Sequence, residues 1–81
     1  MSTWAWEVFD ASGVLRGGNV LSDPWADTPD KAANLMLARW MVKAAPEYRR
    51  LSGWRVRVCG DGVETWADAD EWLQANEGVR R

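Results

Sequence analysis

Alternation of apolar and polar residues predicts a β-hairpin at the start of the chain. Within residues 4–9, two tryptophans and a valine occupy every second position, and successive side chains of a strand point to opposite faces. An Asp-Ala-Ser-Gly segment at 10–13 has the composition of a turn. Residues 14–21 are then predicted to form the returning strand, and the Gly17-Gly18 pair within it predicts a bulge or bend.

The same alternation recurs in the second half of the chain and predicts a second hairpin. Residues 54–59 place a tryptophan and two valines on one face, and two arginines and a cysteine on the other. The Gly-Asp-Gly segment at 60–62 predicts a tight turn, and residues 63–66 are expected to form a short fourth strand.

Between the two hairpins lie the signals of a long helix. Thr28 is a suitable N-cap, Pro29 fits the first helical position, and Asp30 complements the positive end of the helix dipole. We expect the helix to continue to about Ala45, because Pro46 cannot be accommodated in a helix interior.

Helical periodicity gives this long helix two apolar stripes. The stripe that we expect to pack on the sheet contains Ala33, Met36, Leu37, Trp40 and Ala44. A second stripe on the opposite side contains Leu35, Ala38 and Val42. Two interpretations of the second stripe stay open: single apolar residues scattered on a surface, which are normal, or a protein–protein contact.

A shorter helix is predicted over residues 68–77. Asp68 and Glu71 have the spacing of a capping box, and Gly78 is suited to end the helix. Residues 79–81 are then expected to be a frayed basic tail.

The order of these elements predicts an α+β fold in a single small domain over residues 1–78. We expect an antiparallel sheet of three or four strands in ββα-ββα order, with the long helix across one face and the short C-terminal helix at its edge. The predicted core contains Trp4, Trp6, Val8, Val20, Leu37, Trp40, Trp54, Val56 and Val58. The order of elements resembles that of HicB-like antitoxin domains and double-stranded-RNA-binding-like folds, but their signature residues are absent, and order alone carries no function.

The composition lacks the residues on which most catalytic and metal sites depend. The chain has no histidine and one cysteine, Cys59, which excludes a histidine-activated nucleophile and a zinc site built from Cys and His. The acids between residues 61 and 71 lack calcium-loop spacing, so we interpret them as helix-capping and solvated side chains. We therefore predict that the protein is not an enzyme and binds no metal or cofactor, with Cys59 a structural thiol.

The same composition bounds the expected location of the protein. A lone cysteine favours a reducing, cytoplasmic setting. We expect no signal peptide and no membrane partner, because the longest apolar run, residues 35–42, is short and contains Arg39.

Tryptophan content and charge layout remain as signals of function. The chain has seven tryptophans among 81 residues, more than a small core obviously requires. Residues 39–57 hold six basic residues against one acid, whereas residues 58–79 hold six acids and no base. Such segregation is typical of an interaction surface, but mutual neutralisation across the second hairpin, with Arg55 and Arg57 facing Glu64, is the alternative.

The leading hypothesis is therefore a non-enzymatic protein-interaction module that forms a homodimer, because tryptophan is enriched at interfaces and small domains gain stability by associating. Its predicted contact residues are Trp25, Leu35, Ala38, Val42 and Trp66.

The alternative is a nucleic-acid-binding domain that uses the segment 39–57 to contact phosphates and an exposed tryptophan to stack on bases. Its predicted contact residues are Arg49, Arg50, Trp54, Arg55 and Arg57. A surface that mimics nucleic acid is disfavoured by the near balance of twelve acids and ten bases.

Overall fold

Four antiparallel strands form one sheet in the computed structural model of the chain, which describes residues 3–79, with side chains to residue 76. The strands are β1 (Thr3–Phe9), β2 (Leu15–Ser22), β3 (Arg55–Gly60) and β4 (Val63–Asp68). Their order across the sheet is β2-β1-β3-β4. Each predicted hairpin is present, and β1 and β3 join the two hairpins in antiparallel pairing.

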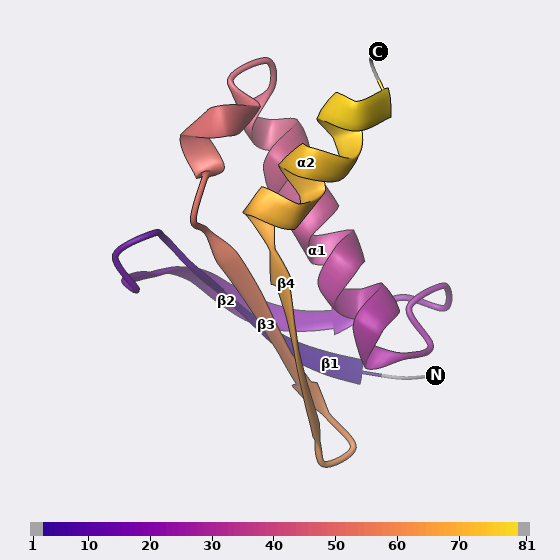
Figure 1. Ribbon diagram of the computed structural model, residues 1–81. Helices are drawn as coiled ribbons and strands as arrows, with labels where there is room; N and C mark the ends of the chain where they lie inside the picture. The colour runs from indigo at the N-terminus through magenta and orange to yellow at the C-terminus, as the bar shows by residue number, and fades with distance from the viewer. Residues whose placement is uncertain (1–2, 80–81) are drawn as a thin grey trace.

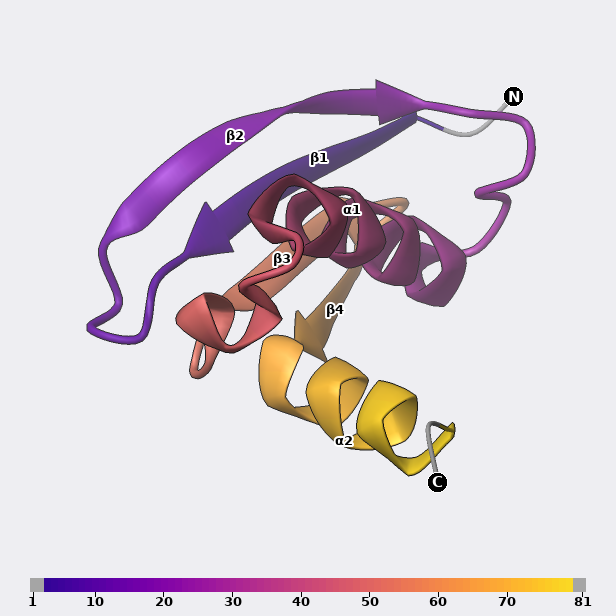
Figure 2. The ribbon, with the colours of Figure 1, turned by 90° about the horizontal axis from the view of Figure 1, so that it is seen from above.

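Two helices accompany the sheet, which confirms the predicted α+β class (Figure 1). The long helix α1 (Pro29–Ala44) lies across one face, mainly over β3 and β4. A 3₁₀ helix (Tyr48–Leu51) packs against it, and α2 (Ala69–Val79) follows β4 directly. Viewed from above, β1 and β2 curve along one side of α1 (Figure 2). β2 is an edge strand of the sheet and lies farther from α1 than β1 does.

The start of α1 follows the signals in the sequence. Thr28 is the N-cap, and its hydroxyl oxygen accepts a hydrogen bond from the Lys31 backbone N–H at 3.2 Å. Pro29 is the first helical residue, where its missing N–H costs nothing. The helix ends at Ala44, one residue earlier than expected and two before Pro46.

The first turn depends on the ionised carboxylate of Asp10. Its Oδ1 accepts hydrogen bonds from the Ser12 hydroxyl at 2.7 Å, the Ser12 N–H at 2.9 Å and the Val14 N–H at 3.0 Å. Arg16 Nε donates to Oδ2 at 2.8 Å. The Ser12 hydroxyl first, then the Val14 N–H, lower the pKa of Asp10 to about 2, because hydrogen bonds to the charged form favour it.

The core lies between α1 and the sheet. Trp4, Val8, Leu37, Val56 and Val58 are buried as predicted, whereas Trp6, Trp40 and Trp54 are half-buried at the margin of the core. The core position predicted for Val20 is wrong, because this side chain is 60% exposed. Leu21, not Val20, pairs with Trp4 and takes the inward position, and neighbouring residues of a strand point to opposite faces.

The buried Trp4 ties three parts of the fold together. Its indole N–H donates to the backbone carbonyl of Ala26 at 2.7 Å, in the loop between β2 and α1. Its ring lies against Gly60 at the end of β3, where a Cβ would collide with it.

The C-terminal boundary differs by a residue from the prediction. Helix α2 starts directly after Asp68, where the capping signal lies, but continues past Gly78 to Val79. Val79, the first residue of the predicted tail, is the last residue of α2, and the other two residues of that tail lie outside the described residues.

Candidate interaction surfaces

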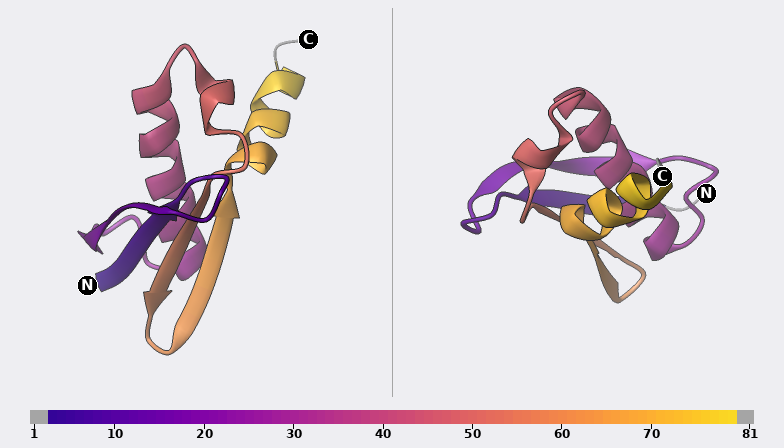
Figure 3. Two further views of the ribbon diagram at one scale, coloured as in Figure 1. Left: turned by 90° about the vertical axis from the view of Figure 1, so that its left-hand side faces the viewer. Right: turned by 45° about the horizontal axis from the view of Figure 1, so that its top comes forward.

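One face of the sheet carries no helix within residues 3–79, and we call it the open face. Figures 2 and 3 show α1 on the other side. Strand register places the following residues on the open face: Ala5, Glu7, Phe9, Val20, Arg55, Arg57, Cys59, Glu64 and Trp66. The open face is therefore a mixed surface of apolar, aromatic and charged side chains from all four strands.

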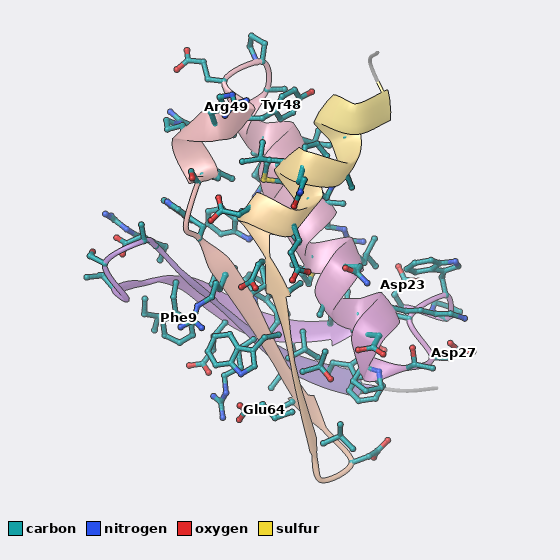
Figure 4. The ribbon with its side chains drawn as sticks, viewed as in Figure 1. Phe9, Asp23, Asp27, Tyr48, Arg49 and Glu64 are labelled. Atoms are coloured by element: carbon teal, nitrogen blue, oxygen red, sulfur yellow. The ribbon has the colours of Figure 1, made fainter. Side chains whose placement is uncertain are left out.

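An aromatic cluster occupies one part of the open face. The rings of Phe9 and Trp66 lie 5.8 Å apart between centroids, although they come from β1 and β4. The Arg55 guanidinium lies 4.6 Å from the Trp66 ring centroid, within the range of a cation–π contact. Trp66 stays 40% exposed, and its indole N–H donates to Glu64 at 2.8 Å. Figure 4 shows Phe9 and Glu64 on the side of the sheet away from α1.

Beside this cluster, Arg57 joins two carboxylates across three strands. Its guanidinium pairs with Glu7 of β1 and, at 2.9 Å, with Glu64 of β4. The hydrogen bond to Glu64, followed by that to Glu7, raises the pKa of Arg57. The pKa of Glu64 is lowered, first by the Trp66 N–H and then by Arg57. The expected pairing of Arg57 with Glu64 across the hairpin is confirmed, whereas Arg55 contacts Trp66.

Two adjoining hollows lie on the α1 side of the sheet and share Trp40 and Lys43 in their walls. The hollow of about 340 Å³ lies between the end of α1, the 3₁₀ helix and Arg16 of β2, and the hollow of about 550 Å³ lies between α1 and Trp6 of β1. We call the two hollows together the basic groove and define it by Trp6, Arg16, Arg39, Trp40, Lys43, Arg50 and Trp54.

A bulge and a glycine in β2 shape this groove. Val8 pairs with Gly17 and Phe9 with Leu15, so Arg16 is an extra residue in the ladder. Its guanidinium lies 5.9 Å from the Trp54 ring centroid, on the α1 side of the sheet. At Gly17 a Cβ would lie 3.0 Å from Trp40 Cζ2, so the absence of a side chain lets the indole rest on the strand.

The cations of the basic groove differ in how far they are neutralised. Arg16 pairs with Asp10 at 2.8 Å, and Arg39 lies 3.6 Å from Asp23. Lys43 lies 5.3 Å from the Trp40 ring centroid. Among the side chains that the structure describes, Lys43 and Arg50 form no ion pair, so their charges are available to a ligand.

The structure distributes the five predicted protein-contact residues over several places. Trp25 is 57% exposed in the loop before α1, with Lys31 Nζ 5.8 Å from its ring centroid. Val42 is exposed and, with Ala38, borders the larger hollow. Leu35 is half-buried and packs against the core, whereas Trp66 lies on the opposite side of the sheet. The α1 stripe and Trp66 therefore do not form one surface.

The predicted nucleic-acid residues are also divided. Trp54 contacts Trp40 at 5.9 Å on the α1 side, and Arg50 lines the same groove. Arg55 and Arg57 project from the open face, because strand neighbours alternate. Arg49 is an exposed residue of the 3₁₀ helix. Five residues of the groove were not among the predicted contact residues, although the last three lie in the predicted basic segment 39–57: Trp6, Arg16, Arg39, Trp40 and Lys43. The Gly17-Gly18 pair predicted a bulge beside Arg16, but not the direction of the Arg16 side chain.

Comparison with known proteins adds no relative: no family model, curated protein or solved structure matches the chain. Within the described residues, no group of three or more Cys, Asp or Glu side chains is placed to hold a metal ion. None of the helices described is long and apolar enough to cross a membrane.

Proposed function

We propose that the protein is a non-enzymatic interaction module that self-associates through the open face of its sheet. The observation that carries this proposal is the uncovered Phe9–Trp66 cluster with Arg55 against it. Tryptophan and arginine are the residues most enriched among those that dominate binding energy at interfaces. Val20 adds apolar area on the same face.

The charges of the open face support a second copy as the occupant. A twofold dimer brings the same patch of both subunits together, so the patch must be complementary to itself. Arg57 pairs with both Glu7 and Glu64, which leaves one negative charge in each copy, and the cation of Arg55 balances it. A patch of one sign would repel its own copy, whereas this mixed patch does not.

The size of the sheet bounds the expected affinity. Four strands about 4.8 Å apart and about six residues long span roughly 19 by 20 Å. This is roughly 380 Å² per copy, less than half of what a standard stable interface buries on each partner, so we expect a weak, reversible dimer with a dissociation constant in the micromolar range.

Sedimentation velocity from about 1 to about 500 µM tests the proposal. We expect the wild type to pass from monomer to dimer, and Val20→Lys to shift the midpoint to at least tenfold higher concentration. Val42→Lys is the matched control, because Val42 is similarly exposed (68%) but lies on α1. Monomer at every concentration refutes the proposal, and loss of the dimer with Val42→Lys alone assigns the contact to α1 instead.

A further inference from the structure

We infer that the basic groove binds single-stranded nucleic acid. The groove lies on the opposite side of the sheet from the open face, so this inference does not depend on self-association. Its walls contain four cationic side chains and no carboxylate: Arg16, Arg39, Lys43 and Arg50. The chain as a whole carries a net charge of −2. The groove is therefore a local concentration of positive charge on an otherwise acidic protein, and such a site attracts an anionic ligand.

Two of these cations are placed to meet phosphates directly. Lys43 and Arg50 both line the smaller hollow and form no ion pair among the described side chains. Arg16 and Arg39 are held by Asp10 and Asp23 and would contribute a weaker field. The groove therefore offers at least two sites at which a phosphate can displace counterions.

The tryptophans favour nucleic acid over an acidic peptide. Trp6, Trp40 and Trp54 are half-buried, so part of each indole faces the groove. Trp40 and Trp54 are 5.9 Å apart between centroids, with Lys43 against one ring and Arg16 against the other. A base stacked at either indole would thus place its phosphate near a cation, which is the arrangement of single-strand-binding surfaces. A purely acidic peptide, such as polyglutamate, would use the cations and leave the indoles without a role.

The shape of the groove favours a single strand over a duplex. Proteins read duplex DNA with an element that enters a groove about 12 Å wide. Here the cations and indoles line two hollows of about 340 and about 550 Å³, which have room for single unstacked nucleotides but not for stacked base pairs.

Tryptophan fluorescence titration with a twelve-nucleotide oligothymidylate tests the inference. We expect quenching with a micromolar dissociation constant at about 50 mM salt. The logarithm of the affinity should fall with the logarithm of salt concentration, with a slope between about −1.4 and −2.8 for two to four phosphate contacts. A twelve-base-pair duplex and polyglutamate are the comparison probes. Absent quenching by the oligonucleotide, or equally tight binding of either comparison probe, overturns the inference.

Paired charge reversals locate the site. Lys43→Glu combined with Arg50→Glu should weaken oligothymidylate binding at least about tenfold. Lys31→Glu combined with Arg55→Glu changes the net charge equally but lies outside the groove, and should weaken binding less than about threefold. Because Arg55 belongs to the open face, both double variants are made and compared in the monomeric Val20→Lys protein. Circular dichroism melts must show both variants folded. Equal weakening by the two double variants would show that the groove is not the binding site.

The monomeric Val20→Lys variant separates the two proposals. It should bind the oligonucleotide as tightly as the wild type does, because Val20 lies on the other face of the sheet. A loss of binding in this variant would show that the groove does not act alone and that the two surfaces depend on each other.

Discussion

The buried indole of Trp4 allows a quantitative test of how the core is held. Trp4 is 2% exposed, and its N–H donates to the carbonyl oxygen of Ala26, a residue that is itself fully buried. Trp4→Phe keeps an aromatic ring at the site but removes the donor and part of the ring. The Ala26 carbonyl would then lose its indole partner, in the loop that leads from β2 into α1.

Two physical terms set the expected loss in the free energy of unfolding. Leaving a buried acceptor without this partner costs about 1 to 3 kcal/mol. Losing about two ring carbons from a closed core costs roughly 1.5 kcal/mol, at about 0.8 kcal/mol for each group the size of a methylene. Together they predict a loss of about 2.5 to 4.5 kcal/mol, which lowers the melting temperature of a domain this size by about 10 °C or more.

Thermal and urea unfolding, followed by circular dichroism, measure the loss. The matched control is Trp25→Phe, the same substitution at an exposed loop position, which should change the free energy of unfolding by less than about 0.5 kcal/mol. If Trp4→Phe melts within about 2 °C of the wild type, or if Trp25→Phe is equally destabilising, the reasoning about the buried hydrogen bond is wrong.

Three further variants test other features of the fold. Gly60→Ala places a Cβ against the buried Trp4 ring and should reduce the free energy of unfolding in urea by about 1 to 3 kcal/mol. Gly17→Ala meets the half-buried Trp40 ring, which can shift, so the stability loss in the same assay should stay below about 1.5 kcal/mol. The pKa of Asp10 lies near 2 in the folded protein but near its ordinary value of about 3.9 in the unfolded chain. The ionised Asp10 carboxylate therefore stabilises the folded protein fully above about pH 4, and this contribution is lost as the pH falls toward 2. Asp10→Asn should therefore melt below the wild type at pH 7, with the difference shrinking between pH 4 and 2; a constant difference would contradict the assigned carboxylate role.

Local signals in the sequence were sufficient to predict the elements of the fold. The Thr28-Pro29 start of α1 and the alternation at 54–59 depend on hydrogen bonds and side-chain directions within a few residues, and both are present in the structure. Strand order was beyond such reasoning, because the β1–β3 pairing joins segments about fifty residues apart. Val20 was misplaced for a related reason: the register of β2 is set by Leu21 against Trp4, across the hairpin.

The candidate surfaces were harder to predict, because charge clusters in a sequence are not clusters in space. The basic segment 39–57 was treated as one patch, but Trp54 and Arg55 are neighbours and so lie on opposite sides of the sheet. Conversely, Arg16 joins Lys43 and Arg50 in the groove from a distant part of the chain. Its position depends on the bulge in β2, and the double glycine predicted a bulge without giving the direction of the arginine.

The tryptophans explain why such a small domain can carry two surfaces. Trp4 fills the core, whereas Trp6, Trp40 and Trp54 line the margin of the core that opens into the basic groove. Trp66 lies on the other side of the sheet, where strand register leaves it uncovered within the described residues. Because α1 lies mainly over β3 and β4, indoles are exposed beside the helix on one side of the sheet and on the open face on the other. Because the two sets do not share a residue, self-association through the open face leaves the basic groove accessible, and either proposal can fail without the other.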